Sequence, residues 1–343
     1  MTCLRSSFWS APMFLLFAAA VGGCAPFPVH NRQIISYTRD AHSAGYDPPG
    51  SPETLEIEWL GTACQSIRLG GASILTDPFV SYHGVSRVLL GTVRSQPRLV
   101  DARLGALRKP GAMFVGHSHY DHMLDLHAAR TRLGWDEVPV VGSETTRNLL
   151  ASFPNGSPPT FHVPQAGSDW TTIAPGVAFR AFAAEHAPQA TNLLLYPGFV
   201  TTPLTEPPKH AGDYRCGDTY AYLFHLRSGS ADFTVYFAGS ASTPPLGFPP
   251  PDVESVDVLI LCVPGWKNVR GYPAELIRRL KPRQIVLSHF DNFLQEGRWP
   301  KWVIPTADLD GFIREALSTC THPRFERLCI PDVGATVRVA RSP

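Results

Sequence analysis

Four side chains that commonly bind metal ions occur within six residues, directly after a short apolar run. The run is 112–115 (AMFV), and the segment after it, 116–122, reads GHSHYDH. Ligands two residues apart point the same way at the end of an extended strand, and the turn that follows directs the next pair toward a neighbouring position. Imidazole and carboxylate groups suit Zn²⁺, Fe or Mn²⁺. The segment therefore predicts one or two divalent metal sites rather than a solvated turn. The four side chains are His117, His119, Asp121 and His122.

The size and charge of the chain limit its classes of partner. It has 343 residues, 44% of them hydrophobic, so it can bury a substantial core. Its 30 basic and 29 acidic residues nearly cancel, giving a net charge of +1. A balanced charge gives no general attraction to nucleic acid, so we expect no nucleic-acid partner.

The first 24 residues have the pattern of an export signal. Arg5 precedes an apolar stretch at 11–21 (APMFLLFAAAV), which is too short to span a bilayer comfortably. The run VGGC at 21–24 resembles a bacterial lipoprotein signal that ends at a lipidated Cys24. We therefore expect an exported, periplasmic protein that is anchored to the outer membrane by lipid. An ordinary cleaved signal and an uncleaved anchor are the alternatives.

The rest of the chain divides into a Pro-rich tether at 25–54 and one folded domain at 55–343. Alternating patterns predict strands at 55–60, 177–184, 220–226 and 233–237, with hairpin turns at Gly70-Gly71 and Gly229. Helices are predicted at 143–153, capped by Ser143, and at 123–133, 273–280 and 307–317. Each half carries hairpins first and strand–helix units afterwards. That order predicts an α/β (α+β) fold, a four-layer αββα sandwich of two mixed sheets flanked by helices.

Further candidate ligands also follow predicted strands. Asp77 follows the strand at 72–76, His186 follows 177–184, and His289 follows 284–287. With the runs at 59–63 (WLGTA) and 75–79 (LTDPF), this distribution resembles the metallo-β-lactamase-fold hydrolases over about residues 55–335. The two runs are most similar to the branch that contains N-acyl-phosphatidylethanolamine phospholipase D and bacterial lactonase-like proteins.

The resemblance implies a role for each of these residues. His117, His119 and His186 would bind one metal, and Asp121, His122 and His289 would face a second. Asp77 would hold a ligand imidazole in its correct tautomer. The family usually has an Asp that bridges the two metals, but Ser240 stands at that position here. Losing that charge should weaken the second metal, unless Asp291 approaches and compensates.

The chemistry implied is hydrolysis by a metal-activated water, of an ester, lactone, amide or phosphodiester bond in a small-molecule or lipid-like substrate. Asp121 would orient that water or carry its proton. The loop at 188–217 is a candidate substrate lid, and Tyr82 and His83 are candidate edges of the pocket. Arginines and a lysine at 87–109 indicate a solvated face more than a site for an anion. The sequence does not decide whether Cys320 and Cys329 form a disulfide. The alternative to an enzyme is a non-catalytic metal-binding scaffold or sensor.

Overall fold

The computed structural model describes residues 53–167, 169–189, 194–296, 303–304 and 307–340. The first strand begins at Leu55, where the sequence predicts the start of the folded domain. Cys24, the signal at 1–24 and nearly all of the tether at 25–54 lie outside these residues. Within the described ranges, none of the helices has the length and hydropathy needed to cross a membrane.

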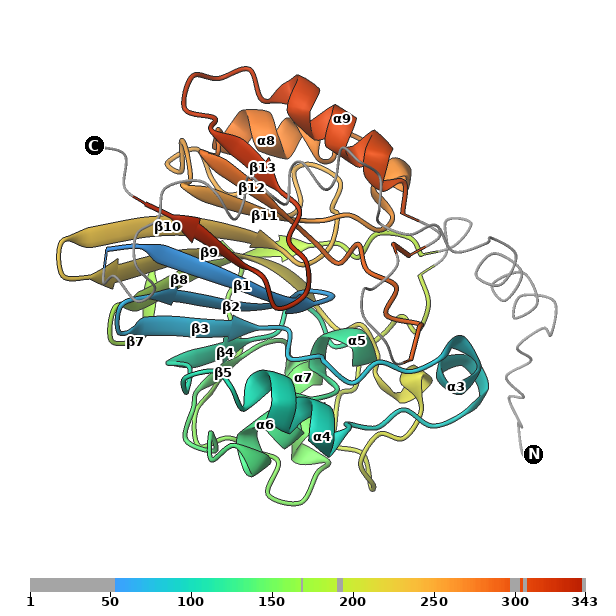
Figure 1. Cartoon of the computed structure of the whole chain (residues 1–343). Helices are drawn as coiled ribbons and strands as arrows, with labels where there is room; N and C mark the ends of the chain where they lie inside the picture. Colours follow the sequence, from blue (N-terminus) through green and yellow to red (C-terminus); the bar gives the residue numbers. More distant parts are fainter. Residues whose placement is uncertain (1–52, 168, 190–193, 297–302, 305–306, 341–343) are drawn as a thin grey trace.

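Two seven-stranded sheets form the centre of the described chain, as Figure 1 shows. The first has the order β14-β1-β2-β3-β4-β5-β6 and the second the order β13-β12-β11-β10-β9-β8-β7. The first consists of β1 (Leu55–Gly61), β2 (Cys64–Leu69), β3 (Ala72–Thr76), β4 (Ala112–Phe114), β5 (Val140–Val141), β6 (Phe161–His162) and β14 (Thr336–Val339). The second consists of β7 (Thr171–Ala174), β8 (Val177–Ala184), β9 (Thr219–Ser228), β10 (Ala231–Ala238), β11 (Val258–Cys262), β12 (Gln284–Ser288) and β13 (Arg327–Cys329).

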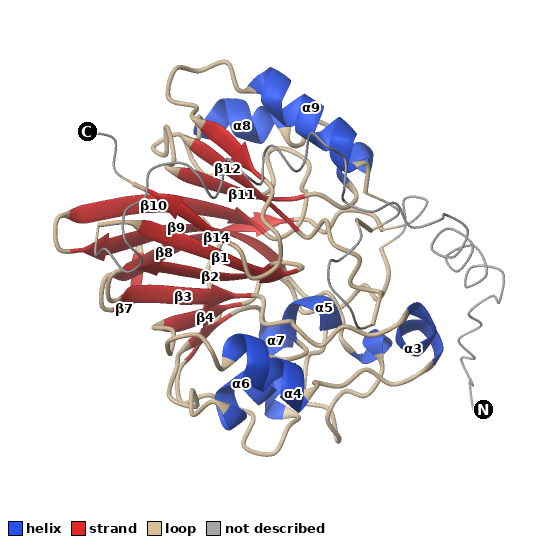
Figure 2. Cartoon of the chain, in the orientation of Figure 1, coloured by secondary structure: helices blue, strands red, loops and turns tan. Residues whose placement is uncertain are grey.

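Helices cover the outer faces of the two sheets (Figure 2). Beside the second sheet lie α8 (Ala274–Leu280) and α9 (Leu309–Thr319), and beside the first lie α4 (Pro97–Leu99), α6 (Leu126–Arg132) and α7 (Glu144–Ala151). The remaining elements are α3 (Val85–Leu90), η1 (Val100–Leu104), α5 (Tyr120–Met123), η2 (Ala211–Asp213) and η3 (Trp266–Asn268). Ser143 caps α7 by accepting a hydrogen bond from the Thr146 amide, as predicted. The αββα fold class is confirmed.

Apolar side chains fill the space between the sheets. Phe114 on β4 packs edge-on against Phe179 and Phe224 of the second sheet, with ring centroids 5.1 and 4.7 Å away. Alternate residues of each strand supply this layer because successive side chains point to opposite faces. Two further apolar clusters join each sheet to its own helices. The packed sandwich thus gives rigid support to the residues at its strand ends.

Strand direction gathers the candidate ligands at one edge. In the first sheet β3, β4 and β5 run parallel, and in the second β10, β11 and β12 do so. β8 also runs parallel to β10, because each is antiparallel to β9. The carboxyl ends of parallel strands meet at the same edge of a sheet. Residues that follow these strands are therefore brought together.

The sequence leaves open whether Cys320 and Cys329 form a disulfide. Cys320 and Cys329 are both free thiols in the structure. Cys320 follows α9 as its C-terminal cap, whereas Cys329 ends the edge strand β13 and is buried in the layer between the sheets. Because the two residues belong to different layers of the fold, no hairpin of the expected kind joins them.

Candidate metal centre

The loop after β4 is held in place by backbone contacts on both sides. The Gly116 amide donates to Asp77 Oδ1 at 2.6 Å, and the Gly116 carbonyl accepts from the Tyr220 amide at 2.8 Å. The Ser118 amide donates to the Cys216 carbonyl at 2.9 Å. His119 is the N-terminal cap of α5, so the helix begins within the motif. Both sheets therefore fix the loop before any ligand is considered.

His117, His119 and His186 form the first ligand group. One ring nitrogen of each lies within 4.8 Å of those of the other two. Both ring nitrogens of His117 and Nδ1 of His119 are buried without a hydrogen-bond partner. His186 donates from Nδ1 to the Ala187 carbonyl at 2.7 Å, which leaves its Nε2 free as an acceptor. Burial lowers the pKa of His119 to about 4 and holds the pKa of His117 and of His186 well below the usual value. Three neutral imidazoles thus converge.

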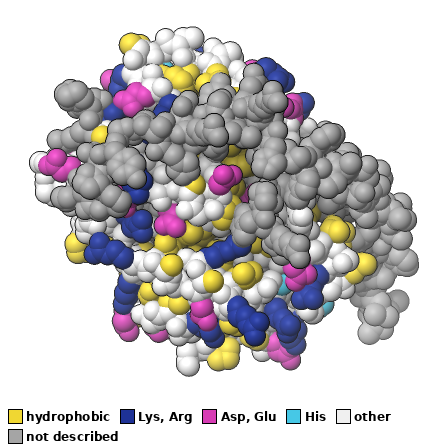
Figure 3. All heavy atoms as spheres, viewed as in Figure 1, with side chains coloured by type: hydrophobic (Ala, Val, Ile, Leu, Met, Phe, Trp, Pro, Cys, Tyr) yellow, Lys and Arg dark blue, Asp and Glu magenta, His cyan; other side chains and the backbone are white. Residues whose placement is uncertain are grey.

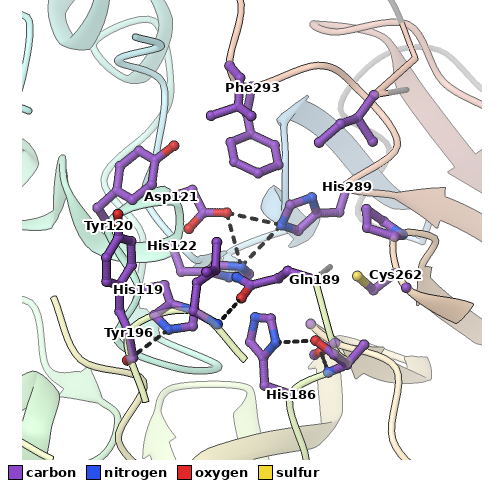
Figure 4. A pocket seen from close by; sticks show the side chains of 18 of the residues that line it. His119, Tyr120, Asp121, His122, His186, Gln189, Tyr196, Cys262, His289 and Phe293 are labelled. Atoms are coloured by element: carbon purple, nitrogen blue, oxygen red, sulfur yellow. Dashed lines mark hydrogen bonds and ion pairs between the residues drawn. The ribbon is translucent and has the colours of Figure 1, made fainter. Parts of the chain in front are cut away.

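Asp121, His122 and His289 form the second ligand group. His289 Nε2 lies 3.2 Å from His122 Nε2 and 3.4 Å from Asp121 Oδ2, as Figure 4 shows. Burial alone would raise the pKa of Asp121, but the hydrogen bond with His289 and the neighbouring imidazoles hold it below the usual range. Asp121 is therefore ionised at neutral pH and offers an anionic oxygen to the space between the two rings.

Asp77 supports the second group from behind. Its Oδ2 accepts a hydrogen bond from His122 Nδ1 at 2.9 Å, and both side chains are fully buried. This bond leaves Nε2 of His122 facing Asp121 and His289. A carboxylate behind a ligand imidazole fixes its tautomer and orientation. The position of Asp77 is the one expected from the resemblance.

Three residues at these strand ends adopt left-handed backbone conformations that side chains rarely adopt. Thr62, Asp77 and His289 have φ angles of 50°, 39° and 62°. Each such residue costs on the order of 1–3 kcal/mol and persists only where its surroundings hold it. The His289 amide donates to the Thr62 carbonyl at 2.7 Å, so two of the three brace each other. Backbone strain is thus concentrated at the ligand groups.

A sequence profile described as the beta-lactamase superfamily domain matches residues 56–289, which include all six residues of the two ligand groups. The chain belongs to that superfamily. With the sandwich and its edge site, it is a metallo-β-lactamase-fold protein with a candidate metal centre. The expected family is confirmed, while the expected branch, which contains N-acyl-phosphatidylethanolamine phospholipase D and lactonase-like proteins, stays a prediction.

Solved structures of the same fold resemble the whole domain. Igni18, a novel metallo hydrolase from Ignicoccus hospitalis, is 15% identical with a TM-score of 0.52, covering 84% of this chain and 100% of its own. The metallo-β-lactamase-fold protein YhfI from Bacillus subtilis is 15% identical with a TM-score of 0.51 and the same coverage. An isothiocyanate hydrolase from Delia radicum gut bacteria is 17% identical with a TM-score of 0.50, covering 83% and 100%.

Curated relatives match only a segment. The uncharacterized proteins Rv0906 of Mycobacterium tuberculosis and Mb0930 of Mycobacterium bovis are each 30% identical over 90 residues. The matched segment is 26% of this chain and 23% of each relative, so it spans about a quarter of their length.

Ser240, at the position where the superfamily usually has its bridging Asp, makes a different contact. Its Oγ accepts a hydrogen bond from the Ala187 amide at 3.0 Å. Ser242 contacts the other side of the same segment, accepting from the Glu185 amide and donating to the Glu185 carbonyl, both at 3.0 Å. These two serines hold the backbone immediately before and after His186. The hydroxyl that replaces the carboxylate therefore supports the first ligand group through the chain.

Asp291 lies in neither ligand group, so its compensating role stays a prediction. Its Oδ1 accepts from the Thr62 amide at 2.9 Å and its Oδ2 accepts from the Tyr82 hydroxyl at 2.6 Å. The side chain is buried beneath the second group and belongs to neither ligand group. Asp291 instead supports Thr62, whose carbonyl receives the His289 amide.

An apolar pocket opens above the ligand groups (Figure 4). Its floor contains His119, Asp121, His122, His186 and His289, and Ser240 and Cys262 lie at one side. Residues of the predicted lid line it too, namely Pro188, Gln189, Leu195 and Tyr196, with 190–193 outside the described residues. Sequence reasoning missed α3 and the segment after β12 as walls, although an apolar run in a basic stretch was a usable signal for α3.

The structure also places Tyr82, His83 and the basic segment 87–109, for which the sequence suggested roles near the pocket. Tyr82 and His83 are buried away from it: Tyr82 contacts Asp291, and His83 contacts the backbone of Arg94. The exposed basic residues of the 87–109 segment do not line the described pocket wall. Basic and acidic side chains are interspersed on the face seen in Figure 3, as a solvated surface would have them. Those exposed residues are Arg87, Arg94, Arg98, Arg108 and Lys109.

Proposed function

We propose that this chain is an exported hydrolase that uses a metal-activated water to cleave an ester, lactone, amide or phosphodiester bond. The observation that carries the proposal is the convergence of two ligand groups on the floor of one pocket. A reactive centre at the base of a largely apolar cleft, with few polar groups, is the usual form of a small-molecule site.

The residues present fit divalent metal ions. Buried nitrogen atoms normally have hydrogen-bond partners, yet both nitrogens of His117 have none. Two ring nitrogens of His122 and His289 face each other at 3.2 Å, which suits a shared cation. Zinc is the metal we propose, because three imidazoles with an open position are a common catalytic zinc site, and iron or manganese suits the same donors.

The chain's own residues set up the chemistry. A divalent metal, when bound, lowers the pKa of a coordinated water and polarises the bond that is attacked. Asp121 is ionised, so it would accept a hydrogen bond from that water and orient it toward the substrate. A carboxylate with a lowered pKa is a weak proton acceptor, which makes orientation the first role of Asp121. His186 is held in one tautomer by Ala187, and the apolar walls limit access of bulk water.

Export and anchoring are supported by the first 24 residues. The apolar stretch at 11–21 and the VGGC run predict that Cys24 becomes the lipidated first residue of the mature protein. Mass spectrometry of protein from native membranes tests this directly. An intact N-terminus, or a mature chain that begins beyond residue 24, contradicts the prediction.

A metal count per chain on purified protein, followed by assays on ester, lactone, amide and phosphodiester substrates, tests the hydrolase. We expect at least one tightly bound divalent ion and turnover that disappears when the ion is chelated and returns when it is restored. Stoichiometric metal with no turnover on any class favours the alternative, a scaffold or sensor, because the ligands would then serve binding alone.

A further inference from the structure

The wall of the pocket is built from apolar side chains that the ligand groups do not need. They come from three segments far apart in the sequence: α3, the loop after His186, and the chain after β12. The six are Val88, Leu89, Leu195, Phe293, Leu294 and Ile304. Phe293 also packs edge-on against the His289 ring, with centroids 5.2 Å apart, so the apolar wall lies directly beside the ligand groups. Three independent segments thus supply one apolar surface beside the reactive centre.

Helix α3 continues this surface to the outside. Val88 is buried, Leu89 is partly exposed, and both line the pocket, while the next residue, Leu90, is 81% exposed. Large apolar residues exposed at the rim of an apolar pocket commonly mark a binding surface. Helix α3 therefore carries apolar side chains both in the pocket wall, at Val88 and Leu89, and on the nearby surface, at Leu90.

The described lining contains no lysine or arginine. Phosphate and carboxylate ligands are usually bound by guanidinium or ammonium groups, because burying an unpaired charge is costly. Apart from the ligand groups themselves, the described wall offers a substrate mainly dispersion contacts and water exclusion. The part of a substrate that lies along this wall, away from the ligand groups, therefore loses less on entering if it is uncharged than if it is anionic.

We infer that the pocket selects an uncharged carbonyl ester or lactone that carries an apolar chain. The carbonyl lies over the two ligand groups, and the chain lies along Leu89 and Phe293 toward Leu90. Water adds to the acyl carbon, the bond from that carbon to the alkoxy oxygen breaks, and the leaving oxygen takes a proton, giving an acid and an alcohol. This inference rests on the proposed hydrolase function and narrows its substrate class.

A chain-length series on the full, metal-loaded protein tests it. With p-nitrophenyl esters from acetate to decanoate, we expect kcat/KM to rise about threefold to fourfold per methylene until the wall is filled. Bis-p-nitrophenyl phosphate should be a poorer substrate than every ester of butyrate length or longer. A flat ester series, or a preference for the phosphodiester, overturns the inference.

A substitution in the wall sharpens the test. In Leu89→Asp the ratio of the decanoate to the acetate kcat/KM should fall at least about tenfold, because a charge replaces an apolar contact in the pocket wall. Val163→Asp is the control, since Val163 is an apolar residue that is accessible to solvent but lies outside the pocket. It should leave the ratio unchanged. An equal fall in both variants, or an unchanged ratio in Leu89→Asp, contradicts the assigned wall.

A binding measurement that needs no turnover distinguishes the proposed hydrolase function from the inferred preference for an apolar chain. Calorimetry on metal-free protein should show tighter binding of 1-decanol than of 1-butanol, and Leu89→Asp should abolish the difference. Such binding without hydrolysis of any substrate leaves the apolar pocket standing and refutes the hydrolase. Ester turnover with neither chain-length dependence nor decanol binding refutes the pocket and leaves the hydrolase.

Discussion

The two ligand groups share the loop after β4 but differ in charge and in what supports them. The first group consists of three neutral imidazoles, and its support consists of a backbone carbonyl and two serine hydroxyls around His186. The second group contains the ionised Asp121, and the buried carboxylates of Asp77 and Asp291 support it directly and through Thr62. Carboxyl groups are thus concentrated on one side of the site.

This difference shows how the superfamily site tolerates the loss of its bridging Asp. Two adjacent divalent ions at a separation of about 3.5–4 Å repel each other, and a shared carboxylate normally offsets part of that repulsion. Here Ser240 offers only a neutral oxygen, and it accepts a hydrogen bond from the Ala187 amide. The first group keeps all three of its ligands. The presence of Ser240 in place of the Asp should therefore weaken the binding of a second ion beside the first.

The largest expected effect comes from removing His117. Both of its ring nitrogens are buried and unpaired, and it belongs to the three-histidine group. His117→Ala should abolish both tight metal binding and hydrolysis, because two remaining imidazoles do not hold an open-site metal firmly. Elemental analysis, activity and circular dichroism check this, with His225→Ala on β9 as the control. Full metal occupancy with unchanged turnover would refute the ligand role.

A smaller effect should follow from neutralising the support of the second group. Asp77→Asn keeps the size of the side chain but removes the charge behind His122. Loss of such a partner typically lowers metal affinity 10–100-fold. Competition with a chromogenic chelator measures it, and Asp257→Asn, which removes a carboxylate bonded to Thr234, is the control. Equal affinities in the two variants would show that Asp77 serves only the fold.

Substitutions at Ser240 test whether the two ligand groups differ in how firmly they bind a metal ion. We expect about one tightly bound metal per chain in the wild type, and Ser240→Asp should raise the count toward two. Ser240→Ala should weaken the metal several-fold by releasing the Ala187 amide, and Ser240→Thr should restore it. Metal counts for the variants decide this. Two stoichiometric metals in the wild type, retained in Asp291→Ala, would contradict this interpretation of the site.

The smallest effect concerns pH. Burial lowers the pKa of His119 to about 4 from a usual value near 6.5, so the unfolded chain takes up this proton before the folded chain does. The free energy of unfolding of the metal-free protein should therefore be steady above about pH 6.5 and fall as pH drops toward 4. Metal affinity should change little between pH 7.5 and 6.5. Denaturant unfolding at several pH values checks the sign; stability that rises on acidification contradicts it.

Much of the fold could be predicted because its signals are local. The hairpin through β9 and β10, the cap at Ser143 and the strand β1 follow from alternation and capping within a few residues. The ligand groups were predictable because the motif supplies four candidates at once and the others follow strands. Short elements escaped prediction, since β6 has two residues and β13 has three, too few to show any period.

The support of the site could not be predicted from local patterns. Asp291 contacts Thr62 and Tyr82 across sequence separations of 229 and 209 residues. Nothing near Asp291 in the sequence indicates those partners, and its place two residues after His289 made a ligand role one possibility beside a solvated or capping role. The contact of Ser240 with Ala187 spans 53 residues in the same way. Tertiary hydrogen bonds thus decide which polar residues face the pocket and which hold it together.

The short length of helix α5 has a consequence for its local opening. It has only four residues, Tyr120–Met123, and it carries Asp121 and His122, while its cap is His119. So short a helix is not stable by itself, because nucleation is costly. Its order should depend on the ions that its own side chains bind, so the free energy of local opening rises with metal occupancy. The backbone amides of α5 should therefore exchange with deuterium slowly in the loaded protein and quickly after chelation, and one local opening would release ligands of both groups at once.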